Sequence, residues 1–336
     1  MWNIFKDIKD LPSGIWDRCI AHGDVCLGSR LISVVQKIYN GHIFHYYAKM
    51  ENGVPEILFM TMTGRERLTF TGHESICVTA MMATPETSGR HYWYDREKYS
   101  FGEFLSQAEQ IIRSTEEGVE ALLVNGLSNM DVAAEQIGWS YMPDLPVSRL
   151  TVDAAAVSLE EHIASLNYKR RYQIKQYREA VAGERYLFEA VEDFLPEMDE
   201  LYPLYAEVVE RSSEYVTEPY TPEYFSVVKN EFGDDAVMIT VKDVLSGEYL
   251  GFMMLLYSKA SCVHQYIGFH RREELFLWHN LTLESIGHSI SKGVRLINMG
   301  VTNAVAKHKF GAKSYDTYSV VKFIGSRLEN GMLPTP

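Results

Sequence analysis

Two polar side chains on one predicted strand are candidates for proton transfer. His264 and Tyr266 alternate in the segment CVHQYIGF, residues 262–269. Because side chains two apart on a strand share a face, this histidine and tyrosine could act together as general base and general acid. The same alternation is also typical of packed or half-exposed strand residues, so both interpretations stay open.

Cationic side chains gather in two places that could bind phosphate groups. Arg211 and Tyr215 are four residues apart, a spacing that presents a guanidinium and a phenol together on a helix. The alternative for Arg211 is an ion pair with Glu207 or Glu210. The segment 168–185 could bind a polyanion, or could simply be a solvated helix face. Its basic residues are Lys169, Arg170, Arg171, Lys175, Arg178 and Arg185.

Other chemistry-bearing residues do not form a recognisable site. His42 and His45 lie on a predicted strand whose period of two sends them to opposite faces, so we predict no metal site. The four cysteines form no C-x-x-C pair and are expected to be reduced, buried thiols. The chain has no P-loop, nucleophile elbow or dinucleotide-binding fingerprint. We therefore predict no tightly bound cofactor.

Composition limits the classes of partner. The 336 residues carry a formal net charge of -13, which argues against coating DNA or an anionic membrane, because such binding needs a surplus of Lys and Arg. The longest apolar run, residues 250–257, is strand-sized, so no membrane insertion is expected. The first residues show no basic region followed by an apolar one. We expect a soluble, cytoplasmic protein that meets any polyanion with a local patch.

The elements that must position these residues occur twice along the chain. A predicted hairpin turns at Gly53, and a second one of the same design turns at Gly247. Each is followed by a helical pattern, a short apolar strand and a polar turn: residues 101–118 precede ALLVNGLSN, and residues 277–293 precede RLINMGVTN. Each half then closes on a predicted strand, PVSRLTV in the first and DTYSVVKF in the second.

This repeat predicts an α/β (α+β) protein with two tandem domains, each a mixed sheet flanked by helices. We place the domains at residues 1–150 and 151–336, with a packed interface and a cleft between them. A helix is predicted over residues 158–184, with Ser158 and Glu161 as a capping box and Gly183 as its stop.

Four segments, in this order, resemble the Fem-type branch of the GNAT acyltransferase superfamily, the FemAB-like or peptidoglycan-biosynthesis-like proteins. They are SLNYKRRYQIKQYREA, RSSEYVTEPYTPEYFSVV, GEYLGFMMLLY and SISKGVRLINMGVTNAVAKHKFGA. The last contains the run Lys307-His308-Lys309-Phe310-Gly311, which is similar to the family's Lys before Phe-Gly. The resemblance covers nearly the whole chain. It implies tandem duplicated GNAT-like domains, the C-terminal one carrying the active site.

The resemblance also implies an activity, namely transfer of an activated acyl or aminoacyl group to an amine with formation of an amide bond in the inter-domain cleft. The donor co-substrate would be acyl-CoA or aminoacyl-tRNA. The usual Arg/Gln-x-x-Gly-x-Gly/Ala loop of CoA-binding GNAT domains is absent, which favours aminoacyl-tRNA or an unusual donor over acyl-CoA. The long coiled-coil insertion of the longest Fem proteins is also absent, which argues against tRNA. The resemblance assigns Arg211, Tyr215, Tyr257 and Lys37 to the phosphates of a phosphorylated acceptor.

Lys307 is the candidate for stabilising the transition state. In the repeat it falls where the first half has Glu135, so only the second half places a cation there. A cation aimed at the reacting carbonyl oxygen, or at a donor phosphate, would stabilise developing negative charge. The alternatives are a solvated basic turn for Lys307 and, for the whole chain, a non-catalytic GNAT-like module that binds a phosphorylated metabolite or a protein partner.

Overall fold

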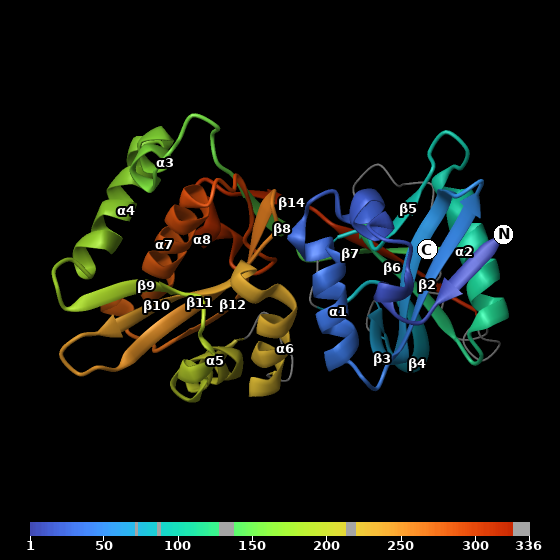
Figure 1. Cartoon of the computed structure of the whole chain (residues 1–336), viewed down its shortest axis with the longest axis horizontal. Coiled ribbons are helices and arrows are strands. Elements are labelled where there is room, and N and C mark those ends of the chain that lie inside the picture. Colours follow the sequence, from blue (N-terminus) through green and yellow to red (C-terminus); the bar gives the residue numbers. More distant parts are fainter. Residues whose placement is uncertain (71–72, 86–88, 128–137, 213–219, 325–336) are drawn as a thin grey trace. The chain divides into compact units, whose positions relative to one another are not determined.

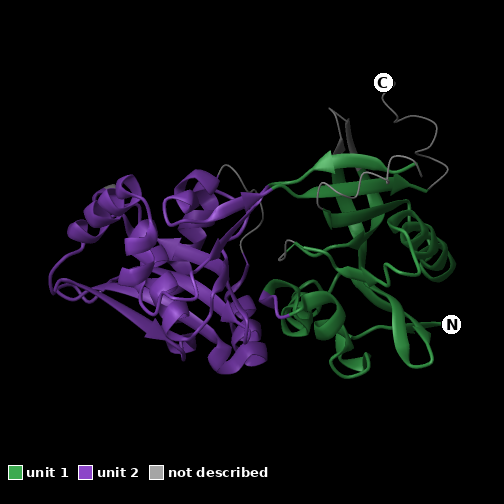
Figure 2. Ribbon diagram, turned by 90° about the horizontal axis from the view of Figure 1, so that it is seen from above, with its two compact units in different colours: residues 1–22, 26–145, 316–336 green, residues 23–25, 146–315 purple. Residues whose placement is uncertain are grey.

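The computed structural model describes residues 1–70, 73–85, 89–127, 138–212 and 220–324. The chain divides into two compact units (Figure 2). Unit 1 comprises residues 1–22, 26–145 and 316–336, and unit 2 comprises residues 23–25 and 146–315. Each unit is built on one mixed sheet with flanking helices (Figure 1), so the predicted fold class is confirmed.

Within its described residues, unit 1 has an eight-stranded sheet in the order β1-β2-β3-β4-β6-β15-β7, with β5 paired to β3. β4 and β6 are parallel. The strands are β1 (Trp2–Phe5), β2 (Ile43–Glu51), β3 (Val54–Phe70), β4 (His73–Met82), β5 (Tyr92–Tyr94), β6 (Ala121–Leu127), β7 (Ser140–Pro143) and β15 (Tyr318–Phe323). The α-helices are α1 (Ser29–Ile38) and α2 (Phe101–Thr115), and the short helical turns are η1 (Ile8–Asp10), η2 (Asp17–Ala21) and η3 (Val25–Leu27), the last reaching into unit 2.

The described part of unit 2 has a seven-stranded sheet in the order β14-β8-β13-β12-β11-β10-β9, in which β12 and β13 are parallel. The strands are β8 (Val147–Thr151), β9 (Tyr186–Val191), β10 (Ala236–Asp243), β11 (Tyr249–Tyr257), β12 (Ser261–Phe269), β13 (Leu296–Asn298) and β14 (Lys313–Tyr315). The α-helices are α3 (Leu159–Ser165), α4 (Tyr168–Ala180), α5 (Met198–Arg211), α6 (Pro222–Phe232), α7 (Leu277–Ser291) and α8 (Ala304–His308). Short turns η5 (Leu195–Glu197), η6 (Gly233–Asp235) and η7 (Glu273–Leu275) precede or follow them.

Apart from β5, the strands of the two described sheets follow the same order, because β1-β2-β3-β4-β6-β15-β7 corresponds to β9-β10-β11-β12-β13-β8-β14. The hairpin β2–β3 turns at Asn52 and Gly53, with φ of 51° and 78°, as a tight hairpin turn requires. The hairpin β10–β11 turns at Gly247, with φ of 76°. Each hairpin is followed by a third antiparallel strand, a helix and a parallel strand. The predicted duplication is therefore confirmed in the topology.

The closing strands of the two halves correct the expected domain limits. PVSRLTV forms β8, which pairs with β13 and β14 in the sheet of unit 2. DTYSVVKF contains β15, which pairs with β6 and β7 in the sheet of unit 1. Each closing strand thus completes the other half's sheet, and the chain returns to unit 1 after residue 315. Strand pairing between distant segments is decided by tertiary contacts that periodicity does not reveal.

The helix predicted over residues 158–184 is two helices, α3 and α4. Ser158 caps α3 as expected, since its hydroxyl accepts from the Glu161 N–H at 3.2 Å. Asn167 then interrupts the helix, because its extended backbone and its side chain, which accepts from the Arg170 N–H at 3.0 Å, begin a new helix. α4 ends at Ala180, before Gly183.

Helices cover both faces of the unit 2 sheet (Figure 1). On one face α7 packs closely, with the Leu281 side chain near Gly251 of β11. On the other face α5 packs so closely that its backbone lies next to Gly268 of β12, where a larger residue would not fit. Among the described residues, no helix is both long and apolar enough to cross a membrane.

Candidate active site

The central strands of the unit 2 sheet separate at one point. β12 and β13 pair over three residues only, the last pair being Val263 opposite Asn298. After Asn298 the chain turns through Gly300 (φ 77°) and Asn303 (φ 53°) into α8. The Asn298 side chain holds this turn by accepting from the Gly300 N–H at 2.9 Å. The next residue of β12 after the last pair is His264, so α8 and His264 lie at the two sides of the opening.

Lys307 lies inside this opening. It is in the last turn of α8 and only 6% exposed. Its Nζ is 3.8 Å from the place where a Cβ on Gly300 would lie, so the missing side chain at Gly300 leaves room for the ammonium. Its charge also acts on His264, whose pKa it helps to depress. The matching residue of the first half, Glu135, lies outside the described residues.

His264 is a neutral imidazole. Burial, reinforced by the charge of Lys307, lowers the pKa of His264 to about 3. Its Nε2 lies 3.1 Å from the Ser285 hydroxyl of α7, and this hydroxyl donates its single proton to the Thr282 carbonyl at 2.8 Å. Nε2 must therefore donate to Ser285, which leaves Nδ1 as the ring nitrogen with a lone pair.

Tyr266 does not share a face with His264, contrary to the prediction. The β11–β12 register shifts so that Met254 faces Tyr266 while Leu255 faces His264, which makes Gln265 an extra residue in a β-bulge. One inserted residue reverses the alternation. Tyr266 consequently packs on the α5/α6 side, with its ring 5.4 Å from that of Tyr205, whereas His264 faces α7.

Tyr257 is buried between the sheet and α7. It is 2% exposed, and its hydroxyl lies 2.8 Å from His288 Nδ1 and 3.1 Å from Ser289 Oγ. Burial raises its pKa far above the usual range of a tyrosine. The resemblance assigned Tyr257 to an acceptor phosphate, but these contacts direct its hydroxyl into the protein interior.

Of the other residues assigned to acceptor phosphates, the structure describes Arg211 and Lys37. Arg211 ends α5, where it pairs with Glu207 at 2.7 Å, donates to the Phe269 carbonyl at 2.9 Å and stacks over the Phe269 ring. This pair is the alternative raised from the sequence. Tyr215 lies outside the described residues, and Lys37 is exposed on α1 of unit 1.

The basic residues of α4 lie on or near the surface. Arg171 donates to the Leu166 carbonyl at 2.6 Å and so closes the end of α3. Lys175 is 3.6 Å from Glu179, and Arg170 is half-buried. Two tyrosines accompany these cations on the exposed side: Tyr168 and Tyr172 are 75% and 54% exposed, with ring centroids 6.5 Å apart.

Sequence reasoning missed three residues that contact the candidate groups, namely Ser285, Tyr177 and His279. Ser285, which fixes the His264 tautomer, is 21 residues away along the chain, and no local spacing connects the two. Lys309 of the basic turn contacts Tyr177 and His279, which belong to two other helices. The Lys307-His308-Lys309 run did point to Lys309, but a loop sequence does not show which helices it faces.

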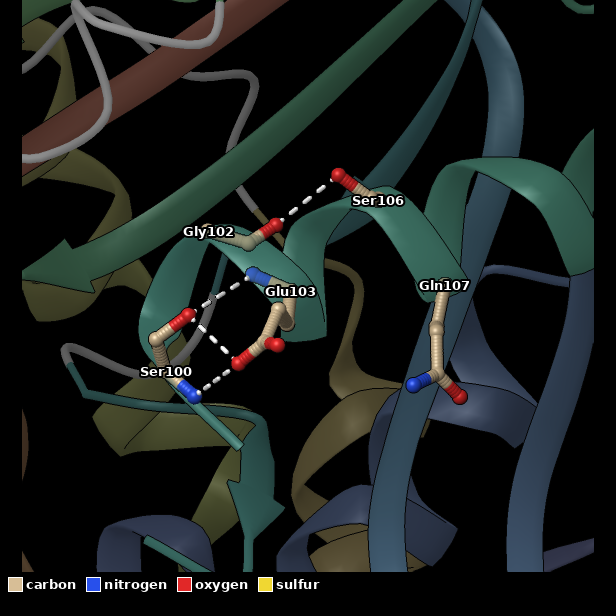
Figure 3. A pocket seen from close by; sticks show the side chains of 5 residues that line it. All are labelled: Ser100, Gly102, Glu103, Ser106 and Gln107. Atoms are coloured by element: carbon tan, nitrogen blue, oxygen red, sulfur yellow. Dashed lines mark hydrogen bonds between the residues drawn. The ribbon is translucent and has the colours of Figure 1, made fainter. Parts of the chain in front are cut away.

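A hollow on unit 1 carries no comparable chemistry (Figure 3). It lies at the first turns of α2 and is lined by Ser100, Gly102, Glu103, Ser106 and Gln107. Its polar groups form hydrogen bonds within α2 and its cap. Ser100 and Glu103 form a capping box, and the Ser106 hydroxyl donates to the Gly102 carbonyl at 2.9 Å. Among the described residues no group of three or more His, Cys, Asp or Glu could hold a metal ion.

No protein-family model and no curated protein matches the sequence. Solved structures match its fold. One is the C-terminal DUF2156 domain of a putative lysylphosphatidylglycerol synthetase from Agrobacterium fabrum, at 14% identity, covering 91% of this chain and 89% of that one with a TM-score of 0.56. FemX is similar at 11% identity, 85% and 90% coverage and a TM-score of 0.58. A tandem GNAT protein from the clavulanic acid biosynthesis pathway is similar at 11% identity, 97% and 99% coverage and a TM-score of 0.56. The chain therefore has the tandem GNAT-like fold that it shares with FemX and these other proteins.

Proposed function

We propose that this protein is an N-acyltransferase or aminoacyltransferase that forms an amide bond at the opening beside Lys307. The observation that carries the proposal is a lysine ammonium, 6% exposed, beside a neutral histidine where two central strands separate. A cation so removed from water interacts more strongly with a developing oxyanion than it would at the surface. The sequence resemblance to Fem-type proteins supports the same reaction.

The reaction needs no covalent enzyme intermediate. The lone pair of the acceptor amine attacks the activated carbonyl carbon, and the C–N bond forms as the carbonyl oxygen becomes negative. Lys307 stabilises this oxygen. The tetrahedral intermediate then collapses, the C–O bond of an ester or the C–S bond of a thioester breaks, and the amine's proton goes to the leaving oxygen or sulfur. Positioning the two substrates together supplies much of the remaining rate.

His264 orients the amine in this scheme. Its Nδ1 lone pair can accept a hydrogen bond from the attacking N–H, because Ser285 occupies Nε2. A group with a pKa of about 3 is too weak a base to keep the amine's proton at neutral pH, which is why the proton passes to the leaving group. Tyr266, on the opposite face of the sheet, takes no part.

Both donor classes remain within the proposal. One structural neighbour is named as a synthetase of lysylphosphatidylglycerol, a product with an aminoacyl group, and another is described with reference to AcCoA. The cations of α4 suit the phosphates of CoA or of tRNA. The acceptor is an amine.

The test is a screen of donors followed by an assay for product. Thermal unfolding of the protein is measured with a panel of acyl-CoAs and aminoacyl-tRNAs, because a ligand that binds only the folded state raises the melting temperature. Each donor that does so is incubated with a panel of amines, and the amide product is detected by mass spectrometry. A stabilising donor that yields an amide supports the proposal. Stabilisation by phosphorylated ligands without transfer to any amine would instead support the non-catalytic binding module.

A further inference from the structure

A second polar cluster lies on the other side of α8, between three helices of unit 2. Lys309 follows the last residue of α8, and its Nζ donates to the Tyr177 hydroxyl of α4 at 3.0 Å. The same Nζ lies 3.5 Å from Nε2 of His279, in the first turn of α7. The rings of Tyr177 and His279 are in contact, tilted by 35° with centroids 4.1 Å apart. Lys309 and His279 are half-buried, so the cluster is reachable from solvent.

Every member of this cluster has a hydrogen to donate. The Tyr177 oxygen accepts from Lys309, so its own hydrogen points elsewhere. His279 Nε2 faces the ammonium and must carry the lone pair, so its Nδ1 carries the hydrogen. Within the described part of the chain, neither of these hydrogens has an acceptor, and no carboxylate pairs with Lys309.

The charge of the cluster is also uncompensated. Burial and the charge of Lys309 lower the pKa of His279 to about 4, so the imidazole stays neutral and supplies no counter-charge to Lys309. His279 lies in the first turn of the 15-residue helix α7, where the backbone adds partial positive charge. A half-buried cation surrounded by donors is completed by an anion with several acceptor oxygens.

We propose that Lys309, Tyr177 and His279 form a binding site for a phosphate group. The site goes beyond the proposed transferase activity, because it would bind a phosphate whether or not transfer takes place. Its ligand class is a phosphate ester or diphosphate, whose oxygens accept from all three side chains. Lys307, in the last turn of α8, and Lys309, just after it, then have separate tasks, the first at the reacting carbonyl and the second at the phosphate.

The test uses the full chain and inorganic pyrophosphate. The His279 ring signals are followed by NMR during a pyrophosphate titration, and the His279 pKa is measured with and without the ligand. We expect saturable binding that weakens with salt, and a higher His279 pKa in the complex because the anion neutralises Lys309. Lys309→Met should weaken binding about tenfold or more, and Tyr177→Phe several-fold. Lys259→Met, which removes an exposed lysine of the turn between β11 and β12, is the matched control and should bind normally.

Two outcomes would overturn the site. One is the absence of binding at millimolar pyrophosphate, and the other is equal binding by Lys309→Met and the unchanged protein. Thermal unfolding of Lys309→Met shows whether the variant folds, and in the folded variant the His279 pKa should rise but stay below its ordinary value, because burial remains. Lys309→Arg keeps the charge and should keep much of the binding. Adenosine 3′,5′-bisphosphate and a short RNA ending in CCA, tested in parallel, distinguish a CoA-type from a tRNA-type source. Binding here with no amide product in any assay would count against the transferase proposal alone.

Discussion

Replacing Lys307 with Met tests the proposed active site most directly. Met keeps most of the aliphatic stem that fills this buried position, 6% exposed, and removes only the charge. An ammonium about 4 Å from an oxyanion contributes about 4 kcal/mol at an effective dielectric constant of about 20. Loss of a single preorganised oxyanion stabiliser elsewhere costs about 10²–10³ in rate. We therefore expect the rate constant of transfer to fall at least about a hundredfold.

The assay is single-turnover amide formation with the donor and amine found by screening, so that chemistry is separated from product release. Lys307→Arg should recover only part of the rate, because a planar guanidinium does not occupy the place of a compact ammonium. Lys313→Met, which removes an exposed lysine of β14, is the matched control and should react normally. A normal rate for Lys307→Met would refute the assignment.

A measurement that needs no substrate tests whether Lys307 and His264 face each other. It uses the same variant, Lys307→Met. The charge of Lys307 contributes to the low pKa of His264, about 3. Lys307→Met should therefore raise the His264 pKa, measured by NMR, while burial keeps it below the ordinary value. An unchanged pKa in a folded variant would mean that the two side chains do not face each other.

Three further predictions concern binding and stability. Reversing the charges of Arg170, Arg171 and Lys175 should weaken binding of a phosphorylated substrate in a titration at low salt, and the difference should shrink as salt rises; equal affinity would assign α4 to a solvated face. Gly268→Ala should lower the free energy of unfolding in urea by about 1–3 kcal/mol, because its Cβ would lie 2.5 Å from a backbone nitrogen of α5; an unchanged midpoint would contradict the close packing. Burial lowers the pKa of His91 to about 4, below its value of about 6.5 in the unfolded chain, so its contribution to stability is complete above pH 6.5 and is lost as the pH falls towards 4. Urea unfolding should show this loss, at about 1.4 kcal/mol per pH unit, and His91→Gln should remove it; an equal slope in both proteins would refute the attribution.

The local sequence determined the elements and their repetition. Asn52-Gly53 and Ser246-Gly247 between apolar runs predicted two hairpins, because glycine and asparagine adopt the positive φ that a tight turn needs. Ser158 predicted a helix start, because its hydroxyl can accept a hydrogen bond from a backbone N–H of the first turn. These signals act within a few residues, so they can be found without knowing the fold. Repeated in the same order, they were sufficient to predict two matching mixed sheets.

The tertiary structure alone decided which strands join which sheet and which side chains meet. β8 and β15 each complete the sheet of the other half, a choice made by pairing with strands on both sides and by burial rather than by their own residues. The bulge at Gln265 turns Tyr266 away from His264. A single inserted residue cannot be detected from the hydrophobic periodicity of the strand, so the sequence alone did not predict this change of face. The burial of Lys307, the Ser285 contact of His264 and the grouping of Lys309 with Tyr177 and His279 all join residues on separate elements. Desolvation and charge act through space, so the chemistry of these groups follows from their neighbours in the fold and not from their neighbours along the chain.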